Sequence, residues 1–144
     1  MAEPKVVVPN KLSVMAQPEI GEVESLSQQG YRAIINNRPD GESPEQPSAA
    51  DVRAEAHKHG MHYEHMPVTL NSITREDVLA FRESFTLAPA PVVAHCRTGK
   101  RSYLLWAAGE VIDGGRSARD LIDQARALGL DVNELPQVIE HIAE

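Results

Sequence analysis

The chain has 144 residues, which suits one compact domain with a substantial apolar core. Its formal net charge of -7 argues against general binding of nucleic acid, because a phosphate backbone needs a basic face. No apolar run approaches the length of a membrane span, and the N-terminus lacks the apolar core of a secretion signal. We therefore expect a single cytoplasmic domain over residues 1–144, with residues 1–10 as an extended lead-in, that binds neither nucleic acid nor membrane.

Short β-branched or apolar runs alternate along the chain with segments of helical spacing. An acidic residue follows three positions after Ser48, Thr74 and Ser117, a pattern that predicts a helix N-cap at each. Strands are expected at 12–15, 32–35, 61–66 and 91–94, and helices at 17–30, 48–59, 74–87, 102–112, 117–129 and 133–143. Four or five strands that alternate with helices predict an α/β three-layer sandwich with a mostly parallel sheet.

A turn-rich loop at 36–47 follows one of the predicted strands. Arg38 and Asp40 lie at its start, where the loops of an open parallel sheet gather round a ligand. Arg38 is then a candidate to hold an anion, and Asp40 a candidate to orient Arg38 or another loop residue. The alternative is an ordinary solvated surface loop.

Four histidines, at positions 57, 59, 62 and 65, suggest a metal site at first sight. The run crosses a helix end, a glycine turn and a strand, so the side chains should diverge. We expect partly exposed histidines and no metal.

The only cysteine, Cys96, stands where the strand at 91–94 becomes a glycine-containing loop before a helix. Such a turn directs several backbone N–H groups into one concavity, which is a site for an anion. Arg97, Lys100 and Arg101 add three cations, and a thiol placed there should lose its proton more easily. The alternative is a small core residue, but five polar or glycine residues follow Cys96. The pattern therefore favours a nucleophilic cysteine that faces an anionic substrate.

Three segments, 36–42, 66–69 and 95–102, together resemble the phosphatase-like domain of the beta-lactamase hydrolase-like proteins, over about residues 10–130. The resemblance implies the fold of cysteine-dependent protein tyrosine and dual-specificity phosphatases. In bacteria such domains are often linked with sulfide metabolism and are sometimes fused to a persulfide dioxygenase, which is therefore an expected partner.

Two departures from the phosphatase pattern decide the predicted chemistry. Those enzymes place five residues between cysteine and arginine, whereas four separate Cys96 from Arg101, as in the loop of rhodanese-type sulfurtransferases. Val68 also stands where dual-specificity phosphatases carry their general-acid aspartate. A narrow ring of N–H groups should suit a sulfane sulfur better than a phosphoryl group.

We therefore predict a sulfurtransferase that passes sulfur from thiosulfate or a persulfide through a Cys96 persulfide, without a cofactor. Cys96 and Arg101 are the predicted catalytic residues. The predicted substrate-binding residues are Arg97, Thr98, Gly99, Lys100, Ser102, Arg38 and Asp40, with Ser102 also expected to cap the following helix and bond the thiolate or backbone. Which of Arg97 and Arg101 faces the substrate stays open at this stage.

Two alternatives remain. One is a tyrosine or dual-specificity phosphatase that acts on a phosphate ester through a Cys96 phosphocysteine, with Arg101 on the phosphoryl oxygens and Asp40 as the acid. The other is a non-catalytic module that binds an anion or a phospho-ligand.

Overall fold

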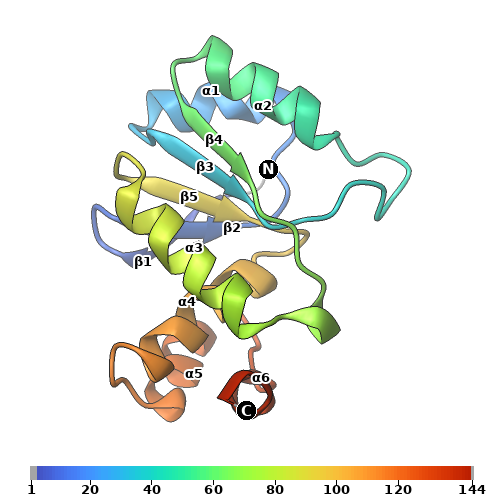
Figure 1. The fold of residues 1–144 in the computed structure, drawn as a ribbon. Helices are drawn as coiled ribbons and strands as arrows, with labels where there is room; N and C mark the ends of the chain where they lie inside the picture. The colour runs from blue at the N-terminus through green and yellow to red at the C-terminus, as the bar shows by residue number, and fades with distance from the viewer. Residues whose placement is uncertain (1–2, 144) are drawn as a thin grey trace.

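A computed structural model describes residues 3–143 of the chain. Five short strands and six α-helices form an α/β sandwich (Figure 1). The strands are β1 Lys5–Val8, β2 Leu12–Met15, β3 Ala33–Asn36, β4 His62–His65 and β5 Val92–His95. The helices are α1 Ile20–Gln28, α2 Ala49–Lys58, α3 Arg75–Leu87, α4 Lys100–Ile112, α5 Ala118–Ala127 and α6 Leu135–Ala143, with a 3₁₀ turn, η1, at Leu70–Ser72.

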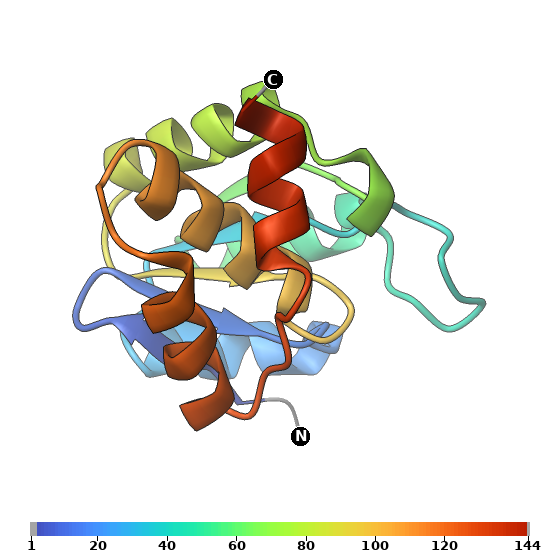
Figure 2. The ribbon, with the colours of Figure 1, turned by 90° about the horizontal axis from the view of Figure 1, so that it is seen from below.

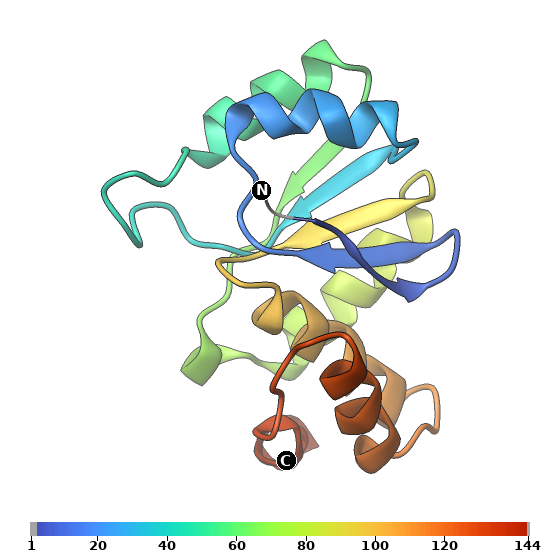
Figure 3. The ribbon, with the colours of Figure 1, turned by 180° about the vertical axis from the view of Figure 1, so that it is seen from behind.

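The sheet has the strand order β1-β2-β5-β3-β4, with β1 antiparallel to β2 and the other pairs parallel. The predicted α/β sandwich with a mostly parallel sheet is therefore confirmed. The predicted lead-in needs correction, because Lys5–Val8 is an edge strand that pairs with β2, as the view from behind shows (Figure 3).

Each inner strand divides its side chains between two apolar clusters, because successive residues point to opposite faces of a sheet. In β3, Ile34 packs with α1 and α2, whereas Ile35 packs on the other face with α3 and α4. The α1–α2 layer and the larger helical layer lie on opposite sides of the sheet in Figure 1.

Helix α4 runs through the middle of the larger layer, with α3, α5 and α6 around it (Figure 2). Every residue from Ser102 to Gly109 is buried, as the apolar sequence of this helix predicts. Trp106 is 1% exposed and packs edge-on against Tyr103, so it is a core residue. Between residues 3 and 143, no helix combines the length and apolar character needed to cross a membrane.

Candidate active site

The register of the sheet brings three chain segments together at the carboxyl ends of its strands. His95 of β5 stands between Met15 of β2 and Asn36 of β3. The residues that follow stay in contact, since Gln17 N–H donates to the carbonyl of Arg97 and Asn37 N–H donates to the carbonyl of His95. The segments after β2, β3 and β5 therefore converge on the loop that begins at Cys96.

Cys96 lies at the base of this convergence and has no exposed surface. The backbone N–H of Gly99 donates to its Sγ at 3.1 Å. Gly99 is the N-cap of α4 and has φ +100°, a conformation that turns the chain into the helix and that side chains rarely allow. The hydrogen bond and the positive end of the α4 dipole both favour negative charge on this sulfur.

Arg101, not Arg97, is the arginine beside Cys96. The side chain of Arg97 is exposed, whereas that of Arg101 is 12% exposed and lies in the first turn of α4. The Glu42 carboxylate, as the largest cause, and the neighbouring Cys96 both raise the pKa of Arg101. Of the two arginines between which the sequence left the choice open, Arg101 is thus the one whose side chain lies beside Cys96.

Glu42 is a site residue that the sequence did not single out. Its two carboxylate oxygens accept hydrogen bonds from Nη1 and Nη2 of Arg101, each at 2.8 Å, and Oε1 also accepts from Nε of Arg38 at 2.9 Å. These hydrogen bonds, led by that of Arg101, lower the pKa of Glu42 to about 2. The one available signal was its place at the end of the 36–42 motif, beside Arg38 in sequence.

Arg38 belongs to the same network and is more buried than Arg101. Its side chain is 5% exposed, and its Nη1 donates to the Gln17 side chain at 3.2 Å. Arg38 therefore holds Glu42 in place, and its contact with a substrate stays a prediction.

Two of the predicted substrate-binding residues, Asp40 and Lys100, have partners in other elements. Asp40 accepts from the backbone N–H of Ala49 at 2.8 Å and so holds the start of α2. Lys100 forms an ion pair with Glu134 next to α6.

Ser102 does not cap α4, because Gly99 holds that position. Its buried hydroxyl donates to Oδ1 of Asn37 at 2.7 Å and thereby ties α4 to the segment after β3. Thr98 is exposed at the mouth of the loop.

His95 precedes the cysteine and is 1% exposed. Burial, the largest cause, lowers its pKa to about 4, so the imidazole is neutral at pH 7. Its Nδ1 lies 3.4 Å from the carbonyl of Cys96, while Nε2 has no hydrogen-bond partner among the described residues.

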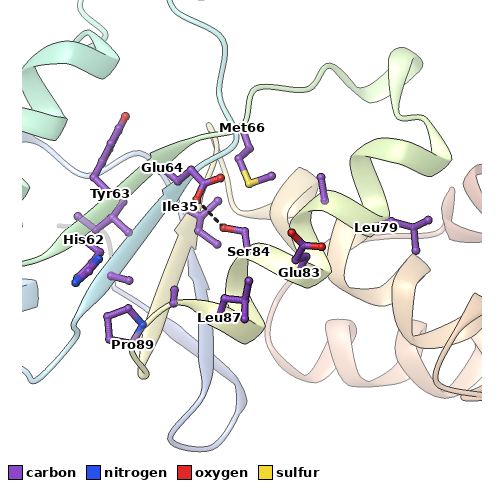
Figure 4. Close-up of a pocket in the computed structure, with 14 residues that line it drawn as sticks. Ile35, His62, Tyr63, Glu64, Met66, Leu79, Glu83, Ser84, Leu87 and Pro89 are labelled. Carbon is purple, nitrogen blue, oxygen red and sulfur yellow. Dashed lines mark hydrogen bonds between the residues drawn. The ribbon is translucent and has the colours of Figure 1, made fainter.

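An open hollow of about 560 Å³ lies between β4 and α3, and its walls carry Leu79, Leu87 and Glu83 (Figure 4). The Ser84 hydroxyl donates to Glu64 there, and most of the lining residues come from β3, β4 and α3. This hollow is distinct from the Cys96 loop. Across residues 3–143, no three side chains of His, Cys, Asp or Glu gather as ligands for a metal ion.

Comparisons with known proteins place the chain in a family. Residues 5–113 match the family model of the beta-lactamase hydrolase-like protein, phosphatase-like domain. The Beta-lactamase hydrolase-like protein of Agrobacterium fabrum is 39% identical over 127 residues, which are 88% of this chain and 30% of that protein. The chain thus spans about a third of the length of this relative.

Solved structures extend the comparison to the fold. A candidate phosphatase from Neisseria meningitidis is 31% identical, with a TM-score of 0.86 over 95% of this chain and 97% of its own. Another from Shewanella putrefaciens, 20% identical, has a TM-score of 0.74 over 95% of this chain and 88% of its own, and shares the fold.

These matches overturn the prediction of a sulfurtransferase. The family model and the Neisseria structure both point to phosphatase-type chemistry. The prediction relied on the four residues between Cys96 and Arg101 and on the valine at position 68. Helix α4 already begins at Lys100, so Arg101 lies in its first turn, beside Cys96. The predicted resemblance is confirmed, and the chain belongs to the family of phosphatase-like domains of the beta-lactamase hydrolase-like proteins.

Proposed function

We propose that the protein is a cysteine-dependent phosphatase that acts on small phosphorylated substrates through a phosphocysteine on Cys96. The observation that carries the proposal is the geometry around one sulfur. A backbone N–H from the start of α4 points at Sγ, and the Arg101 guanidinium lies beside it. This is the arrangement that a thiolate nucleophile and a phosphoryl dianion need together.

Arg101 keeps hydrogen-bonding capacity for a substrate. Its Nη1 is occupied by Glu42 and by the carbonyl of Val68, the latter at 3.0 Å. One N–H of Nη2 also goes to Glu42. Nε–H and the second Nη2 N–H are left to bind two phosphoryl oxygens in a bidentate way.

The reaction then has two steps. The Cys96 thiolate attacks phosphorus, and the bond from phosphorus to the leaving oxygen breaks. Water next attacks the phosphocysteine, the S–P bond breaks, and dihydrogen phosphate and the thiolate are released. Because Cys96 has no exposed surface, the side chains that cover it must move before a substrate reaches the sulfur.

The two arginines of the loop give a matched test. Arg101→Lys should lower kcat/KM for p-nitrophenyl phosphate by about 10²–10³-fold, the typical loss when one preorganised donor is removed. Arg97→Lys, which changes an exposed side chain, should stay within about threefold. Equal effects of the two variants, or undiminished hydrolysis by Cys96→Ser, would overturn the proposal.

A further inference from the structure

The segment that follows β4 lies beside the candidate site, and the group of Val68 that contacts Arg101 is a carbonyl, which accepts a hydrogen bond. Val68 is 6% exposed, with its side chain in the apolar core. Its backbone N–H donates to the carbonyl of Asn37, and its carbonyl accepts from Arg101. This stretch of chain thus anchors the arginine and supplies no proton to a leaving group.

Asp40 and Glu42, two of the three carboxylates of the 36–47 loop, are also committed elsewhere, and the third, Glu45, is exposed. Asp40 is bound to the backbone of Ala49 at the start of α2. Glu42 holds both arginines with both of its oxygens, and its pKa of about 2 keeps it ionised at neutral pH. An ionised carboxylate between two guanidinium groups accepts hydrogen bonds and donates none.

Among the described residues, three further ionisable groups near the loop are ion-paired, within hydrogen-bonding distance of a carbonyl, or neutral. The Lys100 ammonium is paired with Glu134. Nε2 of His65 lies 2.8 Å from the carbonyl of Arg38, within hydrogen-bonding distance. His95 is buried and neutral, and a neutral imidazole is a very weak acid.

We propose that the substrates of this site are phosphoryl compounds whose leaving group departs as an anion without being protonated. Phosphoanhydrides, acyl phosphates and phosphates of acidic phenols belong to this class, and alkyl phosphates such as phosphoserine do not. The proposal rests on the proposed phosphatase function and narrows its substrates. A general acid contributes typically 10²–10⁴-fold to such a step, and that factor is lost for basic leaving groups.

The two reaction steps balance in electrons and protons for a leaving group that departs as an anion. The sulfur lone pair forms the S–P bond, and the pair of the P–O bond leaves with the oxygen, so the first step requires no proton. In the second step, water supplies the oxygen for phosphorus, and both of its protons end on phosphate. The thiolate returns unchanged, and no oxidant, reductant or further reactant is consumed.

A series of aryl phosphates that differ only in the acidity of the phenol tests the proposal on the full chain. We expect kcat/KM to fall by about 100-fold or more from p-nitrophenyl phosphate to phenyl phosphate, the low end of the factor that an acid would have supplied. Acetyl phosphate, with its acidic leaving group, should be turned over at least as well as p-nitrophenyl phosphate. A smaller decrease in kcat/KM from p-nitrophenyl phosphate to phenyl phosphate overturns the proposal, because it means that an acid protonates the leaving oxygen.

Three isosteric variants test the carboxylates of the 36–47 loop. Asp40→Asn, Glu42→Gln and Glu45→Gln should each leave the ratio between the two esters unchanged, whatever they do to the absolute rates. If the series is level in the unaltered protein and becomes steep in one of these variants, that carboxylate is the acid and the proposal is refuted. Absence of hydrolysis of every ester, or hydrolysis that survives Cys96→Ser, would instead refute the phosphatase function itself.

Discussion

The Glu42 carboxylate connects the two arginines that the sequence placed near the site. It lies between Arg38, which also donates to the Gln17 side chain, and Arg101, which also donates to the carbonyl of Val68. Arg101 therefore has a fixed orientation before any substrate arrives. Fixed orientation of a binding group is worth a large factor in rate, because misplacement by about 1 Å can cost 10²-fold.

Replacing this carboxylate tests its positioning role. Glu42→Gln should lower kcat/KM for p-nitrophenyl phosphate by about 10- to 100-fold, because an amide cannot accept from both arginines with both of its groups. Glu110→Gln is the matched control, since Glu110 accepts from Arg82 at 2.7 Å and is about as buried as Glu42. Equal loss of activity in both variants would show that Glu42 acts only through stability.

His95 makes the stability of the protein depend on pH. Its pKa is about 4 when folded, below the ordinary value of about 6.5, so the unfolded chain binds the proton more tightly. The contribution of His95 to the free energy of unfolding should therefore be fully present above about pH 6.5. It should fall by about 3 kcal/mol as the pH drops toward 4.

Urea unfolding at several pH values measures this effect. His95→Asn keeps a donor near the position of Nδ1 and removes the titration. The decline attributed to His95 should be missing from this variant between pH 6.5 and 4, even if its absolute stability is lower. An identical pH profile in both proteins would contradict the account.

Among the elements, α4 matters most to the site, because its first residues follow the cysteine loop directly. The sequence predicted its start near Ser102, because serine is a preferred N-cap. The helix begins two residues earlier, since Gly99 turns the chain by adopting a positive φ. A hypothetical Cβ on Gly99 would lie 3.4 Å from the backbone of Met15, at the end of β2.

Gly99 and Gly30 have nearly the same φ, so alanine variants of both distinguish the effect of backbone strain from an effect on activity. Gly99→Ala and Gly30→Ala should each destabilise the protein by about 1–2 kcal/mol, because φ is +100° and +99° at these sites. A Cβ at Gly30 meets no atom within 4 Å, and Gly30 follows α1, away from the Cys96 loop. Only Gly99→Ala should lose activity, by about tenfold or more, because the N–H that faces Cys96 is displaced. Full activity in Gly99→Ala would contradict the assignment of this N–H.

Local patterns predicted most elements, because their causes are local. Ser48, Thr74 and Ser117 each accept a hydrogen bond from the backbone N–H three residues later, as the sequence indicated. Strand β1 was missed, because two prolines flank it and its pairing with β2 is a tertiary contact.

Long-range contacts explain what the sequence could not give at the site. Cys96 and the choice of an anion site followed from one loop, but the partner of Arg101 is 59 residues away. Without that partner, neither the orientation of Arg101 nor the role of Glu42 was visible. The count of loop residues, together with Val68, led to the wrong chemistry.

At the scale of the whole molecule, the C-terminal helices complete the core on which the site is built. Helices α5 and α6 contribute Leu121, Leu135 and Ile142 to the cluster around α4. The family match ends at residue 113, before both helices. A separate persulfide dioxygenase partner stays a prediction.

A chain that ends at Asp113 tests this architecture. Removal of α5 and α6 uncovers α4, and each large buried side chain that is lost contributed about 1.5–3 kcal/mol. The total is comparable with the whole stability of a typical domain, about 5–15 kcal/mol. We expect no cooperative urea transition by circular dichroism. A cooperative transition with the midpoint of the full chain would show that the two helices are accessory.

The most direct measurement is acid quenching of the reaction with p-nitrophenyl phosphate, followed by mass spectrometry of the peptide that contains Cys96. The account predicts one phosphoryl group on Cys96 within a single turnover, and none in Cys96→Ser. Steady hydrolysis with an unmodified Cys96 throughout, or a phosphoryl group on another residue, would contradict it.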